Sequence, residues 1–158
     1  MRLYAYVGRS DTLELCEGQP MGVAIREADD LAAALAGAVE RTFTFVVAED
    51  GTLRLADRRS EHVACAGGRR VLAAGELTVS TDPLSITEAT NQSTGYCPEP
   101  DCWTALLATL VPLGLPHPST WTRAYTFRRC PACDSRCLIK DDHWHCACGT
   151  RLPTHWNF

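Results

Sequence analysis

Short runs in which apolar and polar residues alternate follow one another along most of the chain. Alternation of this kind is typical of strands that bury one face. We expect strands over residues 3–7, 22–25, 42–48, 52–56, 62–66, 70–79 and 84–90. Asp50-Gly51 and Gly67-Gly68 stand between neighbouring runs, and such pairs favour tight hairpins. The pattern therefore predicts an antiparallel β meander.

Two segments have the composition and the boundaries of helices. One covers residues 29–40, where an aspartate can cap the first turn. The other covers residues 100–110, and Pro112 marks its end. Residues 10–20 are polar and are predicted to form a loop.

Four cysteines close to the C-terminus have the spacing of a metal site. Cys130 and Cys133 form a Cys-x-x-Cys pair, and Cys146 and Cys148 lie about a dozen residues further on. A hairpin between the pairs would bring them together, with residues 138–140 and 143–145 as its two arms. Zinc prefers four such ligands in a tetrahedron, so we predict that these four cysteines bind one structural zinc ion.

This segment resembles the zinc-ribbon family, whose second half is usually Cys-x-x-Cys-Gly. Here His145, and not a cysteine, stands three residues before Cys148. The fourth ligand is therefore either Cys146 or His145, and we favour Cys146 because thiolates bind zinc tightly. Cys137 is a third alternative, but it lies too near Cys133 to replace the far pair. A closed four-ligand site leaves no position for water, which favours a structural ion over a catalytic one.

These elements together predict an α+β fold, an antiparallel β meander with two helices and a C-terminal zinc-ribbon hairpin. We place one domain, the body, at residues 1–120, and the zinc ribbon with its tail, the ribbon segment, at residues 121–158. The tail ends in an aromatic run from Trp156 to Phe158, which we expect to pack back on the body.

The apolar runs and the nine cysteines indicate in which cellular compartment the protein is found. No run of the 158 residues approaches the length of a membrane span, and the apolar stretch at the N-terminus is too short for a signal peptide. We therefore expect a cytoplasmic protein that does not enter a membrane. In that reducing compartment, closely spaced cysteines more often bind metal than form disulfides.

Charge is distributed unevenly along the chain. Residues 1–122 carry 9 basic and 16 acidic side chains, net −7, whereas residues 123–158 carry 6 basic and 3 acidic ones, net +3. The acidic majority argues against broad affinity for nucleic acid. A narrower hypothesis concerns four basic side chains of the ribbon segment, Arg128, Arg129, Arg136 and Lys140. They could contact nucleic acid, or they could dock the ribbon on the acidic body, which we favour.

The middle of the chain carries a distinctive series of residues. It consists of His62, then Ala74-Gly75-Glu76, then Ser93-Thr94-Gly95-Tyr96-Cys97-Pro98. The series resembles a pattern found in uncharacterised bacterial proteins, some of them linked to toxin and conflict systems. The resemblance implies a bacterial origin and a shared β-sheet unit, without a defined activity.

The same stretch offers ligands for a second site. His62, Cys65, Glu76, Cys97 and Cys102 could converge on a metal or a substrate. They do not fit the zinc-deaminase signature, in which the glutamate follows the histidine by two positions and two residues separate the cysteines. A buried cysteine on a strand is most often a small core residue, so we favour a structural role.

Three functions remain in order of preference. The first is a protein-interaction module that recognises a protein partner, such as an enzyme or a toxin encoded nearby. The second is an enzyme with a site near His62, Glu76 and Tyr96. The third is a nucleic-acid-binding adaptor that uses the basic ribbon.

Overall fold

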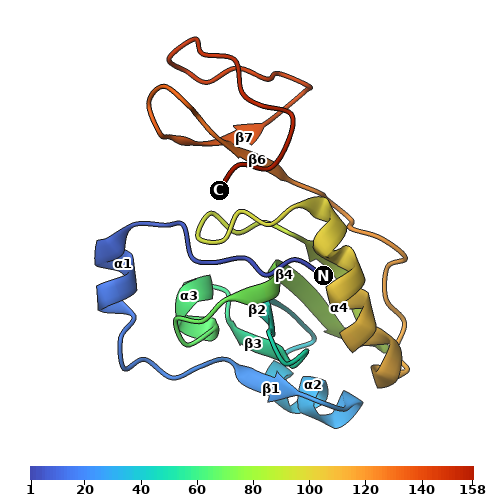
Figure 1. Ribbon diagram of the computed structural model, residues 1–158. Coiled ribbons are helices and arrows are strands. Elements are labelled where there is room, and N and C mark those ends of the chain that lie inside the picture. The colour runs from blue at the N-terminus through green and yellow to red at the C-terminus, as the bar shows by residue number, and fades with distance from the viewer.

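The computed structural model describes residues 1–158, and its centre is a five-stranded antiparallel sheet (Figure 1). The strands are β1 (Val23–Ile25), β2 (Glu40–Ala48), β3 (Leu53–Asp57), β4 (Val71–Thr81) and β5 (Leu84–Thr90). They lie in the order β1-β3-β2-β4-β5, so β2 is central and β1 and β5 form the edges. With its helices, the chain has the α+β fold that the sequence predicts.

The central strand β2 is buried on both faces. Phe43, Phe45 and Val47 point to one side of the sheet, and Thr44 and Val46 point to the other. All five side chains are buried. Helices therefore cover the sheet from two directions, and α4 and α3 lie on opposite sides of β2 in Figure 1.

Helices α2 (Ala28–Leu35) and α4 (Trp103–Leu110) correspond to the two predicted helices. Helix α2 begins with a reciprocal cap, in which the Glu27 and Asp30 side chains accept hydrogen bonds from backbone amides. It ends before the predicted residue 40, because Ala36 adopts the left-handed conformation at φ 49°. Helix α4 follows a single 3₁₀ turn, Pro100–Cys102, and packs against β2 and β4.

Two further helices correct the sequence prediction. Helix α1 (Ser10–Leu15) lies in the predicted loop and buries none of its residues. Helix α3 (His62–Cys65) replaces the predicted strand over residues 62–66. The glycine pair after it has positive φ, and the Gly67 and Gly68 amides donate to carbonyls inside α3. The pair therefore caps a short helix and does not close a hairpin.

The strand predicted over residues 3–7 is also wrong, because most of these residues do not pair with the sheet. Only Tyr4 pairs with the sheet, through a single bridge to Val71 at the start of β4. The Tyr4 amide donates to the Val71 carbonyl at 2.8 Å. Further along, the Val7 amide donates to the Gly95 carbonyl, so the N-terminal segment follows the loop before α4 instead of the sheet.

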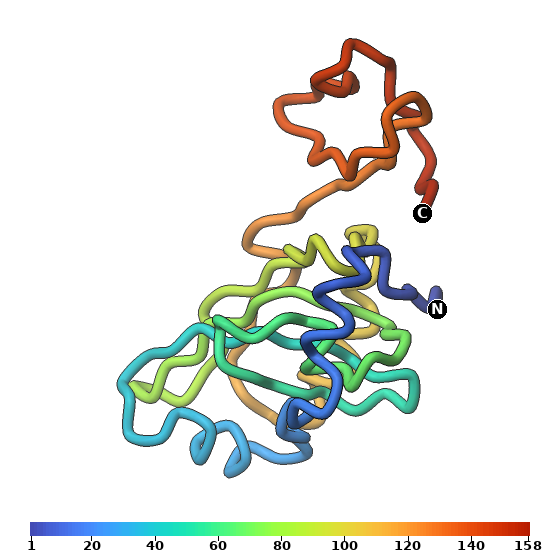
Figure 2. Tube along the Cα trace, turned by 90° about the vertical axis from the view of Figure 1, so that its left-hand side faces the viewer, coloured from blue at the N-terminus to red at the C-terminus, as the bar shows by residue number.

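The ribbon segment stands at one end of the body and holds a separate two-stranded sheet (Figure 2). Its strands are β6 (Thr126–Arg129) and β7 (Arg136–Ile139). The predicted arms at residues 138–140 and 143–145 are joined by only one bridge, from Lys140 to His143. The regular hairpin thus precedes the predicted one, and the first cysteine pair lies in its turn.

The connection between the two regions covers one edge of the main sheet. The Ile86 amide of β5 donates to the Pro116 carbonyl at 2.9 Å, and the Thr122 amide donates to the Ala89 carbonyl at 2.9 Å. Trp121 packs into the core of the body and stacks on Phe45. Strand β1 pairs only with β3, so its outer edge stays free. No helix combines the length and the apolar character needed to cross a bilayer.

Candidate metal centre

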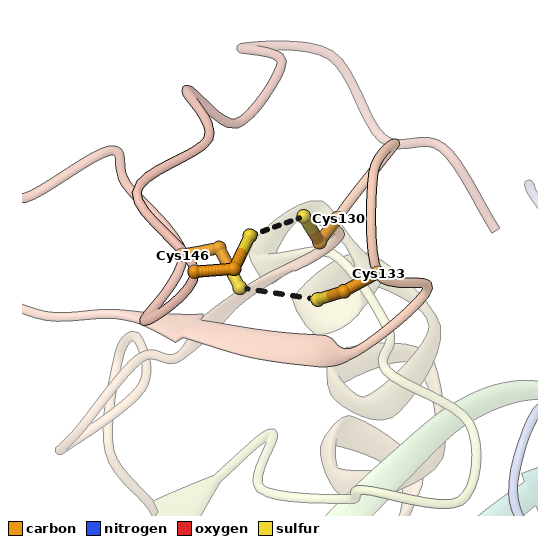
Figure 3. Close-up of side chains that lie close together, drawn as sticks. Cys130, Cys133 and Cys146 are labelled. Carbon is orange, nitrogen blue, oxygen red and sulfur yellow. Dashed lines mark hydrogen bonds between the residues drawn. The ribbon is translucent and has the colours of Figure 1, made fainter.

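The structure brings together the four cysteines that the sequence predicts as ligands. The sulfur atoms of Cys130, Cys133, Cys146 and Cys148 all lie within 4.8 Å of one another. Cys130 is 3.6 Å from Cys148 and Cys133 is 3.5 Å from Cys146, measured between sulfur atoms. In Figure 3, Cys130 and Cys133 reach from one loop toward Cys146 on the facing loop.

The spacing of these sulfur atoms fits a metal ion. Four thiolates placed 2.3 Å from a tetrahedral zinc ion are about 3.8 Å from one another, close to the two measured separations. A disulfide would instead hold its two sulfur atoms about 2.05 Å apart, and all nine cysteines are free thiols. The cluster could therefore hold one metal ion with all four thiols as ligands.

Each cysteine pair sits in a loop closed by the same two backbone hydrogen bonds. In the first knuckle, residues 130–135, the Cys130 amide donates to the Ser135 carbonyl at 2.8 Å. The amide that follows Cys133 donates back to the Cys130 carbonyl at 2.9 Å. The corresponding bonds close the second knuckle, residues 146–150, at 2.9 and 2.8 Å. The Cys-x-Cys pair thus forms the same kind of loop as Cys-x-x-Cys, one residue shorter.

A hydroxyl residue stands two positions after the second cysteine of each knuckle. The Ser135 hydroxyl is 3.1 Å from the Cys133 sulfur, and the Thr150 hydroxyl is 3.2 Å from the Cys148 sulfur. The hydrogen bond with the Thr150 hydroxyl and the one from the Thr150 amide lower the pKa of the Cys148 thiol to about 6. The Ser135 hydroxyl and amide lower the pKa of Cys133 in the same way. Both environments favour the thiolate, which is the form that binds metal.

The two alternative ligands lie outside the cluster. His145 is exposed, and its ring lies 5.4 Å from the ring of His143. Its backbone bridges to Arg151, a pairing that directs Cys146 toward the other thiols. Cys137 lies on β7 with its sulfur 3.6 Å from the Ser135 carbonyl oxygen. The cluster that could hold the ion is therefore the four-cysteine set.

Arg128 joins the ribbon segment to the body. Its side chain is only 4% exposed and pairs with Glu99 at 2.6 Å. The same guanidinium donates to the carbonyls of Phe127, Pro153 and Thr154. One buried cation thus connects the body, strand β6 and the C-terminal tail.

The last residues of the chain return to the body, as the sequence predicts. Asn157 forms two hydrogen bonds with the Arg129 backbone, at 2.8 and 2.7 Å. The Trp156 indole donates to the Cys97 carbonyl at 2.9 Å, and its ring meets Tyr4 edge-on at 5.6 Å. Buried Asn91 accepts from the Tyr125 amide at 2.6 Å and holds the start of the ribbon in the same region.

Three of the four basic side chains singled out in the ribbon segment form contacts within the chain. Arg128 is buried against Glu99, and Arg129 pairs with Asp134 at 3.1 Å. Arg136 donates to the Thr94 carbonyl of the body. Arg128 and Arg136 thus contact the body, which agrees with docking of the ribbon, whereas Arg129 pairs within the ribbon segment.

The candidate catalytic residues of the body form no hydrogen bonds with one another. The Nε2 atom of His62 lies within hydrogen-bond distance of the Gly75 carbonyl oxygen, at 2.8 Å, and burial lowers the pKa of His62. Glu76 pairs with Arg58 at 3.4 Å. The Tyr96 hydroxyl donates to the Arg69 carbonyl at 2.7 Å. Each group is occupied by a different structural contact.

The remaining cysteines of the middle segment are separate buried thiols. Cys65 lies 3.7 Å from the Arg54 carbonyl oxygen, and Cys97 lies 3.5 Å from the Thr94 carbonyl oxygen. Burial raises the pKa of Cys65, Cys97 and Cys102 to about 12 in each case. The one group of metal-ligating residues that the structure brings together is the cluster in the ribbon segment.

Some functional residues escaped the sequence analysis. Ser135 and Thr150 were not singled out, although Cys-x-Ser at the first knuckle and Cys-x-Thr at the second form a repeated signal. The Glu99 partner of Arg128 carries no local signal, because it lies 29 residues away in the chain. Comparison of the chain with protein-family models, with curated proteins and with solved structures finds no match.

Proposed function

We propose that the chain binds one structural zinc ion through Cys130, Cys133, Cys146 and Cys148 and acts as a protein-interaction module. The observation that carries the metal assignment is the approach of four thiols to within 4.8 Å of one another. An all-thiolate set favours zinc over magnesium or calcium, which take oxygen ligands. Four protein ligands complete the tetrahedron, so the ion serves folding and not catalysis.

Elemental analysis of the purified protein tests the metal assignment. We expect one zinc per chain. Cys146→Ala should lower the zinc content and His145→Ala should leave it unchanged, because only Cys146 lies in the cluster. Loss of zinc in His145→Ala with retention in Cys146→Ala would overturn the ligand set, and a metal-free chain would overturn the zinc assignment.

Protein binding is supported by apolar side chains that stay exposed on α1, on the edge strand β1 and on the segment between them. Leu15 on α1 is 76% exposed, and Val23 on β1 is 64% exposed. Met21 lies between them in the chain and is 37% exposed. Exposed apolar side chains beside an unpaired strand are typical of surfaces that other chains cover. The resemblance of the middle segment suggests a partner from a bacterial toxin or conflict system.

His62, Glu76 and Tyr96 each make a different structural contact, which supports an interaction module over an enzyme. Capture of a partner from bacterial lysate tests this choice when it is repeated with variants. Leu15→Ser combined with Val23→Ser should abolish capture. Val39→Ser is the matched control, because Val39 is 70% exposed outside this surface. Equal capture by all three proteins, or none by the wild type, would count against the module.

A further inference from the structure

A cavity of about 320 Å³ lies beside the turn that joins α3 to β4, away from the ribbon segment. Three arginines line it: Arg54 from β3, and Arg69 and Arg70 from the turn. Its apolar wall includes Met21, Ala66 and Val71. Its size reaches the range of small-molecule sites. Its lining combines an apolar wall with a charged side, to which Glu49 and Asp50 also belong.

Arg54 is the unusual member of this group. Its Nη1 atom donates to the Gly22 carbonyl at 3.0 Å, but its Nε atom is buried without any hydrogen-bond partner. This is the one buried side-chain nitrogen or oxygen of the chain in that state. Arg54 also takes part in none of the six ion pairs. A half-buried guanidinium that forms no ion pair keeps the capacity to bind an external anion at its accessible end, although the charge of Asp50 lies close enough to interact with it.

The neighbouring charges leave room for one anionic group. Arg70 is shared with Glu49 at 3.6 Å, and Asp50 accepts the Thr52 amide at 2.9 Å. Arg69 is exposed and forms no ion pair or side-chain hydrogen bond. The lining therefore carries three cations against two carboxylates, a net positive charge in a chain whose net charge is −4. A small monoanionic or dianionic group matches this balance better than a polyanion.

We propose that this cavity binds a small organic anion, a carboxylate or phosphate group attached to an apolar body. The accessible end of the Arg54 guanidinium, together with Arg69, holds the anionic group. Met21 and Ala48, which also lines the cavity, pack on the apolar part. A second, separate cavity of about 330 Å³ also has Met21 in its lining. This binding site goes beyond the proposed function and does not depend on the metal.

Phenyl phosphate is the probe that tests the site, with inorganic phosphate and phenol as its two halves. Titration followed by amide chemical shifts should show saturable binding of phenyl phosphate that perturbs the residues around Ala66 and Val71. Phenol and inorganic phosphate should bind more weakly than phenyl phosphate. Absence of saturable binding by phenyl phosphate, or equal affinity for inorganic phosphate, would overturn the proposal.

Substitutions identify the groups that hold the anion. Arg54→Gln should weaken phenyl phosphate binding at least about tenfold, the effect expected for a lost charged hydrogen bond. Arg69→Gln should also weaken it, and this exposed position keeps the test valid if Arg54→Gln does not fold. Arg59→Gln is the control, because Arg59 is exposed and lies outside the cavity. Unchanged binding in both Arg54→Gln and Arg69→Gln would refute the site, whatever the zinc content of the chain.

Discussion

The body and the ribbon segment are stabilised in different ways. The main core is a cluster of 27 buried residues, whereas the ribbon's own core consists of Cys130, Cys146 and Leu152. Two of those three are residues of the metal cluster. A segment that buries so little apolar surface does not offset its loss of chain entropy by packing alone. The ribbon therefore needs its docking contacts, and the metal ion proposed for its cysteine cluster, in a way that the body does not.

Removal of one cysteine ligand should produce the largest difference in stability between the two regions. Cys130→Ser should release the ion and unfold the ribbon segment, because structural zinc supplies on the order of 10 kcal/mol to segments of this kind. Amide hydrogen exchange should show loss of protection from about residue 126 onward. Protection in β2 and β4 should remain, since their core contains none of the ligands.

Cys137→Ser is the matched control for that experiment. It removes a ribbon cysteine that lies outside the cluster, so the zinc content should stay at one per chain. If Cys130→Ser kept its metal, or if β2 and β4 lost protection together with the ribbon, the two regions would not be independent in the way proposed here.

Breaking the contact between the two regions should cause the next largest loss of stability. Glu99→Gln leaves the buried Arg128 charge without its partner at 2.6 Å. Breaking a buried ion pair from one side is strongly destabilising, here by about 3 kcal/mol. Urea unfolding should report this loss, and the zinc content should not change. Glu49→Gln is the comparison, because its pair with Arg70 is exposed and contributes less than about 1 kcal/mol. Equal losses in the two variants would contradict the role of Arg128 as a buried anchor.

The sequence predicts most of the body where local signals agree. The β2–β3 hairpin, α2 and α4 carry alternation, turn residues or caps within a few positions of one another. Helix α3 was mistaken for a strand, because a short apolar run has no periodicity that separates the two, and its glycine pair fits either a hairpin or a helix end. Helix α1 was missed because it buries no side chain and so leaves no apolar stripe.

The candidate metal centre was predicted more completely than the contacts that support it. Cysteine spacing depends on local loop geometry, and it is visible in the sequence. The pairing of Arg128 with Glu99 and of Asn157 with the Arg129 backbone joins positions 28 or 29 residues apart. Such partners are selected by tertiary packing, and a single sequence holds no pattern that reveals them.

The smallest change in stability should come from His62, whose titration makes the stability of the body depend on pH. Burial lowers the pKa of His62 from its ordinary value of 6.5, so the unfolded chain takes up its proton at a higher pH than the folded chain does. Stability from this group is therefore complete above pH 6.5 and declines as the pH falls from there toward the lowered pKa.

His62→Gln removes the titration while an amide N–H can still donate to the Gly75 carbonyl. Unfolding free energies measured by urea between pH 5 and pH 7.5 should fall less steeply for His62→Gln than for the wild type. Acid also protonates thiolates and releases metal, so the zinc content has to be followed at each pH. His155→Gln, at an exposed position of the tail, controls for the loss of any histidine. If all three proteins lose stability with the same slope, the acid response belongs to the ribbon and its ion, and the body contributes none of it.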